Sequence, residues 1–361
     1  MTLDPTISHP DGDLVDVRPE GLAGPGGVFF VDPWRPVEHA IITHAHADHA
    51  RPGSRHYLTT SDGAGVLRTR LGADASIQTV AYGEPLRLGD ATVSLHPAGH
   101  VLGSAQVRID VGGRVAVVSG DYKRHADPTC VPFEPVPCDV FVSECTFGLP
   151  IYRWPDPAAV FADINAWWRR CQDDGRTAVI FVYAFGKAQR LLAGADASIG
   201  PILVHGAIDR LLPAYHAAGV ELPETSRADH ENAKRARGRA LVLAPPSARG
   251  STWIRKFGPV ATAMASGWMR VRGQRRRRSV DRGFVLSDHA DWPGLEATIA
   301  ETGATRVLLT HGATEPMTRW LRERGVDAGV LPTPYEGEME ESNEPPPDRA
   351  DGRTDGQAEA G

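Results

Sequence analysis

The stretch that decides the fold of this 361-residue chain is residues 39–49, which read HAIITHAHADH. Its apolar first half predicts a buried strand, and its second half places three histidines and an aspartate directly after that strand. On a strand-to-helix turn, all four side chains can spread toward two neighbouring ions. A helix could not direct all four toward the ions, because its 3.6-residue period places them on different faces. We therefore interpret His44, His46, Asp48 and His49 as metal ligands rather than as a solvated, histidine-rich turn.

Two further candidate ligands follow later strands. They are His100 in PAGH (residues 97–100) and Asp121 in SGDY (residues 119–122). Either residue alone is typical of an ordinary turn, but in series with the first motif they complete a set of ligands. A carboxylate such as Asp121 can bridge two cations, while imidazoles fill the remaining positions and leave room for a hydroxide.

Composition places the chain among ordinary globular proteins. Hydrophobic residues make up 41% and charged residues 23% of the sequence, and its length predicts about two lobes. No apolar run is long enough to span a membrane and the first ten residues do not resemble a secretion signal, so we expect a cytoplasmic protein that contacts no membrane. The four cysteines are expected to be reduced thiols. Because the net charge is −6, nucleic-acid binding would have to come from local basic patches.

Hydrophobic patterning divides the chain into three parts and a tail. Short strands are predicted first, over residues 27–32, 39–43, 91–96, 105–111, 115–119 and 140–143. An α/β segment follows, with a helix over residues 158–170, a buried strand over 178–182 and a helix beginning at residues 186–192. Strands at residues 283–286 and 306–310 would then complete the first lobe. The acidic, proline-rich residues 336–361 are predicted to be disordered.

With this ligand series the chain resembles the metallo-β-lactamase superfamily. The resemblance implies that His44, His46 and His100 hold one Zn²⁺, that Asp48, His49 and His311 hold the other, and that Asp121 bridges them. Two Zn²⁺ ions are therefore the expected cofactors, with Mn²⁺ as the alternative metal. Asp32 matches the first acidic motif of the superfamily, and it is expected to hold the ligand loop in place rather than bind metal.

Later residues narrow the resemblance to the β-CASP nucleases. Glu144, His289 and His311 match the acid, the histidine near a second acid and the final histidine of that branch. The implied fold is α/β, an αββα metallo-β-lactamase sandwich with an inserted short β-CASP-like α/β domain. The expected boundaries are 1–147 and 283–335 for the two parts of the sandwich, 148–282 for the insert and 336–361 for the tail.

The short insert is similar to that of bacterial ligase-associated DNA-damage-response exonucleases, which are themselves similar to messenger-RNA 3′-end processing factors. The amino-acid sequences of residues 147–150, 186–190 and 204–206 support this likeness. It implies functional association with a DNA ligase and a helicase. His311, however, favours the RNA-processing branch, because eukaryotic DNA cross-link repair nucleases lack a histidine at that position.

The mechanism expected from these residue types is phosphodiester hydrolysis. Two cations would polarise the diester and lower the pKa of a bridging water toward ~7. His289, held protonated by Glu144, would donate a proton to the leaving oxygen, and Asp48 belongs to the same catalytic group. A metal ligand or a turn residue remains the alternative reading of His289.

Contacts with nucleic acid need positive charge. The strongest basic run is Arg275, Arg276, Arg277 and Arg278, with a solvated loop as the alternative. Lys187 and Arg190 begin a predicted helix, where backbone N–H groups also favour phosphate. His205 is assigned equally to a phosphate contact or to the core, and Trp167 and Trp168 are assigned to helix packing.

The leading functional hypothesis is a metal-dependent DNA exonuclease of a repair pathway. The runner-up is an RNA 3′-end processing endonuclease or exonuclease with the same site. A thioester hydrolase of the glyoxalase II kind would share the residue 44–49 motif but would not need Glu144, His289 or a basic insert. A binding scaffold without activity is disfavoured by the intact ligands in every motif.

Overall fold

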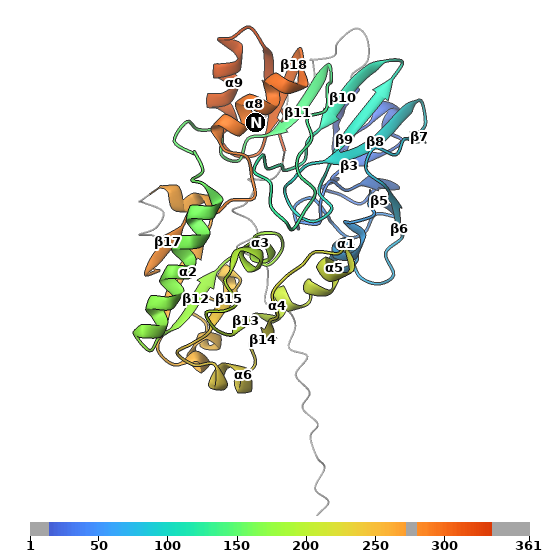
Figure 1. Cartoon of the computed structure of the whole chain (residues 1–361). Helices are drawn as coiled ribbons and strands as arrows, with labels where there is room; N and C mark the ends of the chain where they lie inside the picture. The colour runs from blue at the N-terminus through green and yellow to red at the C-terminus, as the bar shows by residue number, and fades with distance from the viewer. Residues whose placement is uncertain (1–13, 272–279, 334–361) are drawn as a thin grey trace, which may run out of the picture.

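The computed structural model describes residues 14–271 and 280–333, and it contains three sheets (Figure 1). The arginine run at residues 275–278 and the acidic tail at residues 336–361 lie outside the described residues. No helix in the described residues has the length and apolar character needed to cross a membrane.

Two of the sheets face each other across an apolar core. The first sheet has the order β1 (Asp16–Arg18), β2 (Gly21–Ala23), β3 (Phe30–Val31), β4 (His39–Ile41), β5 (His56–Thr60) and β6 (Ile77–Val80). The second has the order β19 (Asp327–Val330), β18 (Arg306–Thr310), β11 (Val140–Glu144), β10 (Arg114–Val118), β9 (Ala105–Val111), β8 (Ala91–Pro97) and β7 (Leu86–Leu88). Buried side chains of both sheets, such as Ile41 and Val107, form one cluster between them.

Helices cover the outer faces of this pair of sheets. Buried Val66 and Leu67 of α1 (Ala64–Leu71) pack with Ala40 and Tyr57 of the first sheet. On the second sheet, α8 (Trp292–Thr302) and α9 (Thr314–Arg322) bury Leu295 and Met317 against the strands β11 and β18. The layer order is therefore helix, sheet, sheet, helix, and the predicted αββα fold class is confirmed. We call this unit the sandwich.

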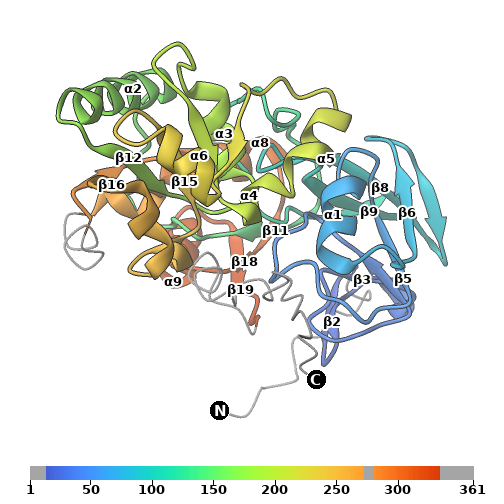
Figure 2. The same ribbon diagram turned by 90° about the horizontal axis from the view of Figure 1, so that it is seen from below.

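The third sheet forms a separate lobe beside the sandwich (Figures 1 and 2). Its order is β14 (Ser226–Arg227), β13 (Ile202–Val204), β15 (Leu241–Ala244), β12 (Thr177–Phe181), β16 (Val260–Ala265) and β17 (Arg282–Phe284), and all its pairs are parallel. Its helices are α2 (Pro157–Asp173), α3 (Lys187–Gly194), α4 (Gly206–Asp209), α5 (Leu212–Ala217) and α6 (His230–Arg235). We call residues 157–284 the insert lobe, because they lie between the adjacent parallel strands β11 and β18.

One predicted strand belongs to a different sheet than expected. The strand expected at residues 283–286 forms as β17, but it pairs with β16 of the insert lobe and not with the sandwich. Hydrophobic patterning cannot identify the pairing partner of a three-residue strand. We therefore propose that the insert ends after Phe284 rather than at Arg282.

The helix α2 shows how the insert lobe is stabilised. Asp156 caps it by accepting a hydrogen bond from the Ala158 N–H at 3.1 Å, and Pro157 occupies its first turn. On its inner face, Trp168 is 0% exposed and its Nε1–H donates to Arg239 O at 2.9 Å. Trp168 is therefore a core residue, as its assignment to helix packing predicts.

Trp168→Ala should lower the free energy of unfolding by about 3–5 kcal/mol, because it leaves a large cavity in the core of the insert lobe. Urea unfolding followed by circular dichroism measures this change. Ile151→Ala is the control, since Ile151 is 54% exposed and should change stability by no more than about 0.5 kcal/mol. Equal stabilities of the two variants would contradict the assignment of Trp168 to the core.

Candidate metal centre

The candidate ligands come from loops that follow strands of the two facing sheets. The loop after β4 carries His44, His46, Asp48 and His49, the loop after β8 carries His100, the loop after β10 carries Asp121, and His311 follows β18. Strand ends of the two sheets thereby deliver side chains that are up to 267 positions apart in the sequence to one place.

Gly120 allows Asp121 to reach this place. Its φ is +55°, and a Cβ at this position would lie only 2.6 Å from the Cβ of Thr43 in the ligand loop. A larger residue would therefore force the β10 loop away from the ligand loop. The glycine before the aspartate is thus part of the ligand motif.

Eight described residues form three overlapping groups, and within each group one ligand atom from each residue lies within 4.8 Å of the others. The groups are His44, His46, His100 and Asp121; His49, Asp121 and His311; and Asp121, Glu144 and His289. Asp121 belongs to all three, so a carboxylate stands where two ions would share a ligand. Asp48 belongs to none of them, although its Oδ2 lies 3.6 Å from His49 Nε2.

Distances around Asp121 agree with a bridging position. Its Oδ2 lies 3.5 Å from both His44 Nε2 and His49 Nε2 and 3.8 Å from His100 Nε2. Its Oδ1 lies 3.6 Å from Nδ1 of His311, a residue in the left-handed region with φ +60°. Such backbone strain in a non-glycine residue is typical of functional sites.

Each of four histidine rings is fixed by a hydrogen bond on one nitrogen. His46 Nε2 donates to Phe185 O at 3.3 Å, and His100 Nδ1 donates to Asp288 O at 2.8 Å. His49 Nδ1 contacts Asp32 Oδ2 at 2.7 Å, and His44 Nδ1 lies 3.1 Å from Thr43 Oγ1. Partners of this kind orient the ring and choose which nitrogen faces a metal.

The opposite nitrogens provide the test of whether these residues fit a metal. His44 Nε2, His49 Nε2 and Asp121 Oδ1 are buried, and no hydrogen-bond partner satisfies them among the described residues. Buried polar atoms without partners are costly, and a cation in their midst removes that cost. Imidazole and carboxylate are also the ligand types that Zn²⁺ prefers. The site therefore fits metal ions.

Electrostatics point the same way. Burial, followed by the neighbouring histidines, holds the pKa of His44 and His100 well below the ordinary value, and burial lowers the pKa of His46 to about 4. These rings are neutral at pH 7, which is the form that binds metal. At His49 burial lowers the pKa, but the carboxylates of Asp48, Asp121 and Asp32 outweigh burial and raise it.

A carboxylate–histidine pair lies beside this cluster. His289 Nδ1 is 2.9 Å from Glu144 Oε2 and 3.9 Å from Asp121 Oδ2. Glu144 is 1% exposed, and its Oε1 accepts the Tyr122 N–H at 2.7 Å, which fixes the carboxylate at the end of β11. The ring of His289 is thereby oriented with its Nε2 directed away from Glu144.

Asp32 holds the ligand loop through three contacts. It accepts the Thr43 N–H at 2.8 Å and the Thr43 hydroxyl at 2.5 Å, in addition to its contact with His49. Asp32 itself has φ +44° at the end of β3. This geometry agrees with a residue that positions ligands and does not bind metal.

Asp32→Ala should weaken metal affinity about 10- to 100-fold, because His49 and Thr43 lose the group that orients them. Competition between the protein and a chromophoric chelator measures this affinity. Asp16→Ala is the matched control, since Asp16 is an exposed aspartate of the same sheet. Unchanged affinity in Asp32→Ala would show that the loop holds its shape without the carboxylate.

Lys187 and Arg190 lie in a buried ionic cluster and not on an open surface. Arg190 Nη1 is 3.5 Å from Asp288 Oδ1, and Lys187 Nζ is 4.0 Å from Asp288 Oδ2. Arg190 Nε is also 3.6 Å from Asp127, a carboxylate that pairs with Lys123. With exposures of 1% and 4%, Lys187 and Arg190 serve the contact between the lobes, and substrate phosphates cannot reach them in this arrangement.

Sequence reasoning missed two residues that fix the histidine rings, one in the insert lobe and one in the segment that follows it. Phe185 and Asp288 act through backbone carbonyls, which any residue type supplies, so no sequence signal marks them. It also missed Arg70 of α1, whose Nε donates to Ala45 O in the ligand loop at 2.6 Å.

Comparisons with known proteins identify relatives of two kinds. A protein of Opitutus terrae named "Probable DNA ligase" is 32% identical over 336 residues, which cover 91% of this chain and 32% of that protein. "Endoribonuclease YSH1" of Gibberella zeae is 27% identical over 176 residues, covering 47% of this chain and 20% of that protein. "Cleavage and polyadenylation specificity factor 73" of Drosophila melanogaster is 29% identical over 137 residues, covering 36% of this chain and 20% of that protein.

The chain therefore spans about a third of the length of the first of these relatives and about a fifth of the other two. No family model matches it. Among solved structures, a protein of unknown function from Enterococcus faecalis superimposes with a TM-score of 0.57 at 13% identity, covering 82% of this chain and 79% of that one. At that identity the likeness concerns the fold alone.

Proposed function

Because the chain belongs to the β-CASP nuclease branch of the metallo-β-lactamase superfamily, a group of metal-dependent hydrolases, we propose that it hydrolyses phosphodiester bonds of nucleic acid. The observation that carries the proposal is the His289–Glu144 pair, 2.9 Å apart and next to the carboxylate of Asp121, which is common to the three candidate ligand groups. A metal cluster alone would suit many hydrolases. A buried, oriented histidine beside it adds a proton donor for a poor leaving group.

The ligands that would hold two Zn²⁺ ions are His44, His46 and His100 on one side and His49 and His311 on the other, with Asp121 between them. Asp48 completes the second set in the arrangement that we propose, through its position next to His49. When bound, the ions polarise the diester and make a hydroxide available at neutral pH.

The residues of the chain perform the remaining work. His289 donates a proton from Nε2 to the leaving oxygen, and Glu144 stabilises the charged ring through Nδ1. Buried Phe147, whose ring centroid is 5.9 Å from that of His289, helps to keep water from this side of the pair.

We propose that DNA is the preferred substrate and that the reaction belongs to DNA repair. The support is the extent of the match, since the relative named "Probable DNA ligase" aligns over 91% of the chain and the endoribonuclease over 47%. A matching region inside a longer protein with that name also supports joint action with a DNA ligase. The helicase partner rests on the family resemblance alone. RNA is the second candidate, supported by the similarity to the two RNA-processing proteins.

End-labelled single-stranded DNA and RNA of matched sequence decide between these substrates. We expect the specificity constant for DNA to exceed that for RNA by tenfold or more. A preference for RNA would move the chain to the second candidate. Hydrolysis of a small thioester such as lactoylglutathione at a higher rate than DNA or RNA would contradict both nucleic-acid candidates. It would favour the glyoxalase II-like reaction.

The arginine run is proposed to bind the phosphates of the strand. Neutralising Arg275, Arg276, Arg277 and Arg278 should weaken binding for all sequences and flatten the slope of log K against log salt by roughly 0.7 for each lost contact. The reason is that fewer counterions are released when fewer phosphates are neutralised. Fluorescence anisotropy with single-stranded DNA at several salt concentrations measures the slope.

A control variant neutralises three exposed arginines in and after α6 of the insert lobe, Arg235, Arg237 and Arg239. Arg235 and Arg239 make local contacts, and Arg237 donates to Lys256 O. The salt slope of this variant should match that of the wild type. If the four-arginine variant also keeps the wild-type slope, the run is a solvated loop.

A further inference from the structure

The two proposed sets of metal ligands differ in where the groups that orient their rings come from. We call them the sandwich set and the junction set: the sandwich set is Asp48, His49 and His311, and the junction set is His44, His46 and His100. His49 of the sandwich set is oriented by a carboxylate at the end of β3, within the sandwich itself. In the junction set, the carbonyls that orient His46 and His100 come from residues 185 and 288, in the insert lobe and in the segment that follows it.

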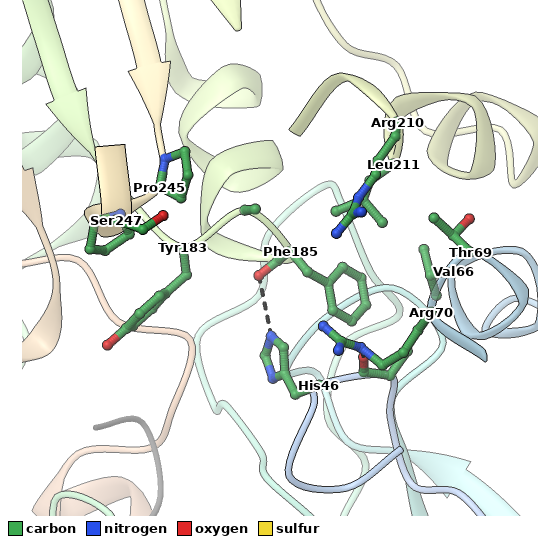
Figure 3. A pocket seen from close by; sticks show the side chains of 13 residues that line it. His46, Val66, Thr69, Arg70, Tyr183, Phe185, Arg210, Leu211, Pro245 and Ser247 are labelled. Carbon is green, nitrogen blue, oxygen red and sulfur yellow. Dashed lines mark hydrogen bonds between the residues drawn. The ribbon is translucent and has the colours of Figure 1, made fainter. Parts of the chain in front are cut away.

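The carbonyl that orients His46 belongs to a short loop of the insert lobe. Figure 3 shows the hydrogen bond from His46 Nε2 to Phe185 O, which is 3.3 Å long. This loop runs from the end of β12 to the start of α3, and the ring of Phe185 also lies edge-on to that of His46, with centroids 5.0 Å apart. The loop therefore sets the direction of His46 Nδ1, which lies 3.1 Å from His100 Nε2 in the cluster.

A buried side chain of α3 holds this loop on both sides of Phe185. Gln189 is 0% exposed, its Oε1 accepts the Gly186 N–H at 2.8 Å, and its Nε2 donates to Ala184 O at 3.0 Å. Because the two bonds flank Phe185, they fix the peptide group whose oxygen faces His46. Gln189 thus acts on a candidate metal ligand through one intervening carbonyl.

The next residue of α3 holds the carbonyl that orients His100. Arg190 is 4% exposed, and its Nη1 donates to Ser287 O and lies 3.5 Å from Asp288 Oδ1. Asp288 O in turn accepts from His100 Nδ1 at 2.8 Å. Arg190 Nε also lies 3.6 Å from Oδ2 of Asp127, which belongs to the loop after β10 in the sandwich. Arg190 therefore connects the two lobes at the point where the ring of His100 is fixed.

Such contacts influence metal affinity because they order a ligand before the ion arrives. A histidine that loses its partner can turn to other rotamers, and metal binding must then overcome the entropy of ordering it again. For the junction set this order comes from α3. His49 of the sandwich set contacts Asp32, Asp48 and Asp121, which all belong to the sandwich.

We propose that Gln189 and Arg190 are positioning residues for the metal ion of the junction set, and that this ion binds firmly only while the insert lobe is docked on the sandwich. The inference rests on the two-ion site of the proposed function and goes beyond it, because it makes one ion dependent on the insert lobe and the other independent of it. α3 is then the element that transmits the position of the insert lobe to the metal centre.

Titration of the metal-free protein with Zn²⁺, in competition with a chromophoric chelator, tests this inference by resolving the two binding steps. Gln189→Met replaces the amide with an apolar group of similar size and removes both hydrogen bonds. It should weaken one step about 10- to 100-fold and leave the other within about threefold of the wild type. Arg190→Lys keeps the positive charge of the buried cluster but loses the planar guanidinium that reaches Ser287 O, and it should also weaken one step about tenfold.

Matched controls come from the opposite end of the sheet in the insert lobe. Gln172→Met removes the bonds of a glutamine of α2 to Ile199 O and Arg239 O, which precede β13 and β15. Arg176→Lys changes an arginine that precedes β12 and donates to Val260 O. These substitutions disturb the same lobe without reaching the carbonyls at the metal centre. Both controls should bind two ions with the affinities of the wild type, and circular dichroism checks that every variant is folded.

Combination with Asp32→Ala identifies the ion that is affected. Asp32 orients His49 of the sandwich set, so Asp32→Ala and Gln189→Met should each weaken one step, and the double variant should weaken both. General loosening of the protein would not divide the two steps in this way. A double variant that keeps one step at wild-type strength would show that both residues act on the same ion, and it would overturn the inference.

Three further outcomes separate this inference from the proposed function. If Gln189→Met and Arg190→Lys bind both ions as the wild type does, or weaken both steps equally, the inference is wrong and the nuclease function stands. A wild type that binds fewer than two ions overturns the inference together with the two-ion site. If the two steps respond as expected but neither DNA nor RNA is cut, the proposed function fails and the role of α3 stands.

Discussion

Asp121→Ala is expected to lose both metal ions and to lower nuclease activity by a factor of roughly 10³ or more. Asp121 is the only residue common to all three ligand groups of the described chain, and its oxygens lie within 3.8 Å of nitrogens of His44, His49, His100 and His311. A neutral water would not replace the carboxylate of Asp121 between the two proposed ions, because it would not offset the repulsion between two cations. The buried histidines would then lack both their metals and their anion.

Elemental analysis of the purified protein together with the rate on labelled DNA measures this effect. The wild type should contain two ions per chain, since the ligand set exceeds what one tetrahedral zinc can use. Asp110→Ala is the control, because Asp110 is a carboxylate of β9 that pairs with Arg108 away from the cluster. An active wild type with a single ion, or an Asp121→Ala variant that keeps two, would contradict a bridged pair.

His289→Ala is expected to retain its metals and to lose about 3–5 kcal/mol of transition-state stabilisation. The ring is oriented by Glu144 and stands next to Asp121, where it can protonate the oxygen that leaves the phosphorus. A leaving group that needs no proton removes the need for this ring. Bis(p-nitrophenyl) phosphate should therefore recover much of the loss that is seen with DNA.

Two comparisons separate this role from that of a metal ligand, since His289 also belongs to one of the ligand groups. His311→Ala should lose metal, and its rate of hydrolysis should fall equally on both substrates. The reason is that Nδ1 of His311 lies by Asp121 in the ligand cluster, and no carboxylate of the described residues orients its ring as Glu144 orients that of His289. Glu144→Gln should reproduce part of the His289→Ala loss on DNA and shift the pH profile of the rate. If His289→Ala loses metal and is slowed equally on both substrates, it acts as a ligand.

Much of the metal centre follows from local sequence, because ligand spacing after a strand is a local property. The loop at residues 44–49, His100 and Asp121 all stand at strand ends that alternating hydrophobicity predicts. The pairing of His289 with Glu144 spans 145 positions, and only the family resemblance placed the two together. The αββα fold class is implied by the family resemblance that the same motifs carry.

Other features depend on tertiary contacts that no local pattern contains. Lys187 and Arg190 carry the charge expected of a phosphate site, but their partner Asp288 lies about 100 positions away, and its position decides that they are buried. β17 is similar, since its sheet is set by β16 rather than by its own residues. A pocket lined by Arg70 of the sandwich and Arg210 of the insert lobe is built from both lobes. Neither stretch of sequence predicts it by itself.

The carbonyls that fix His46 and His100 come from Phe185 and Asp288, and the last candidate ligand is His311. On the ribosome, a nascent chain that has emerged only as far as residue 180 has its first histidines in place but nothing that orients two of them. Metal binding and folding are coupled at such sites, so we expect firm metal binding only after residue 311 has emerged. During synthesis the ligand set would therefore be completed only after the whole insert lobe has emerged.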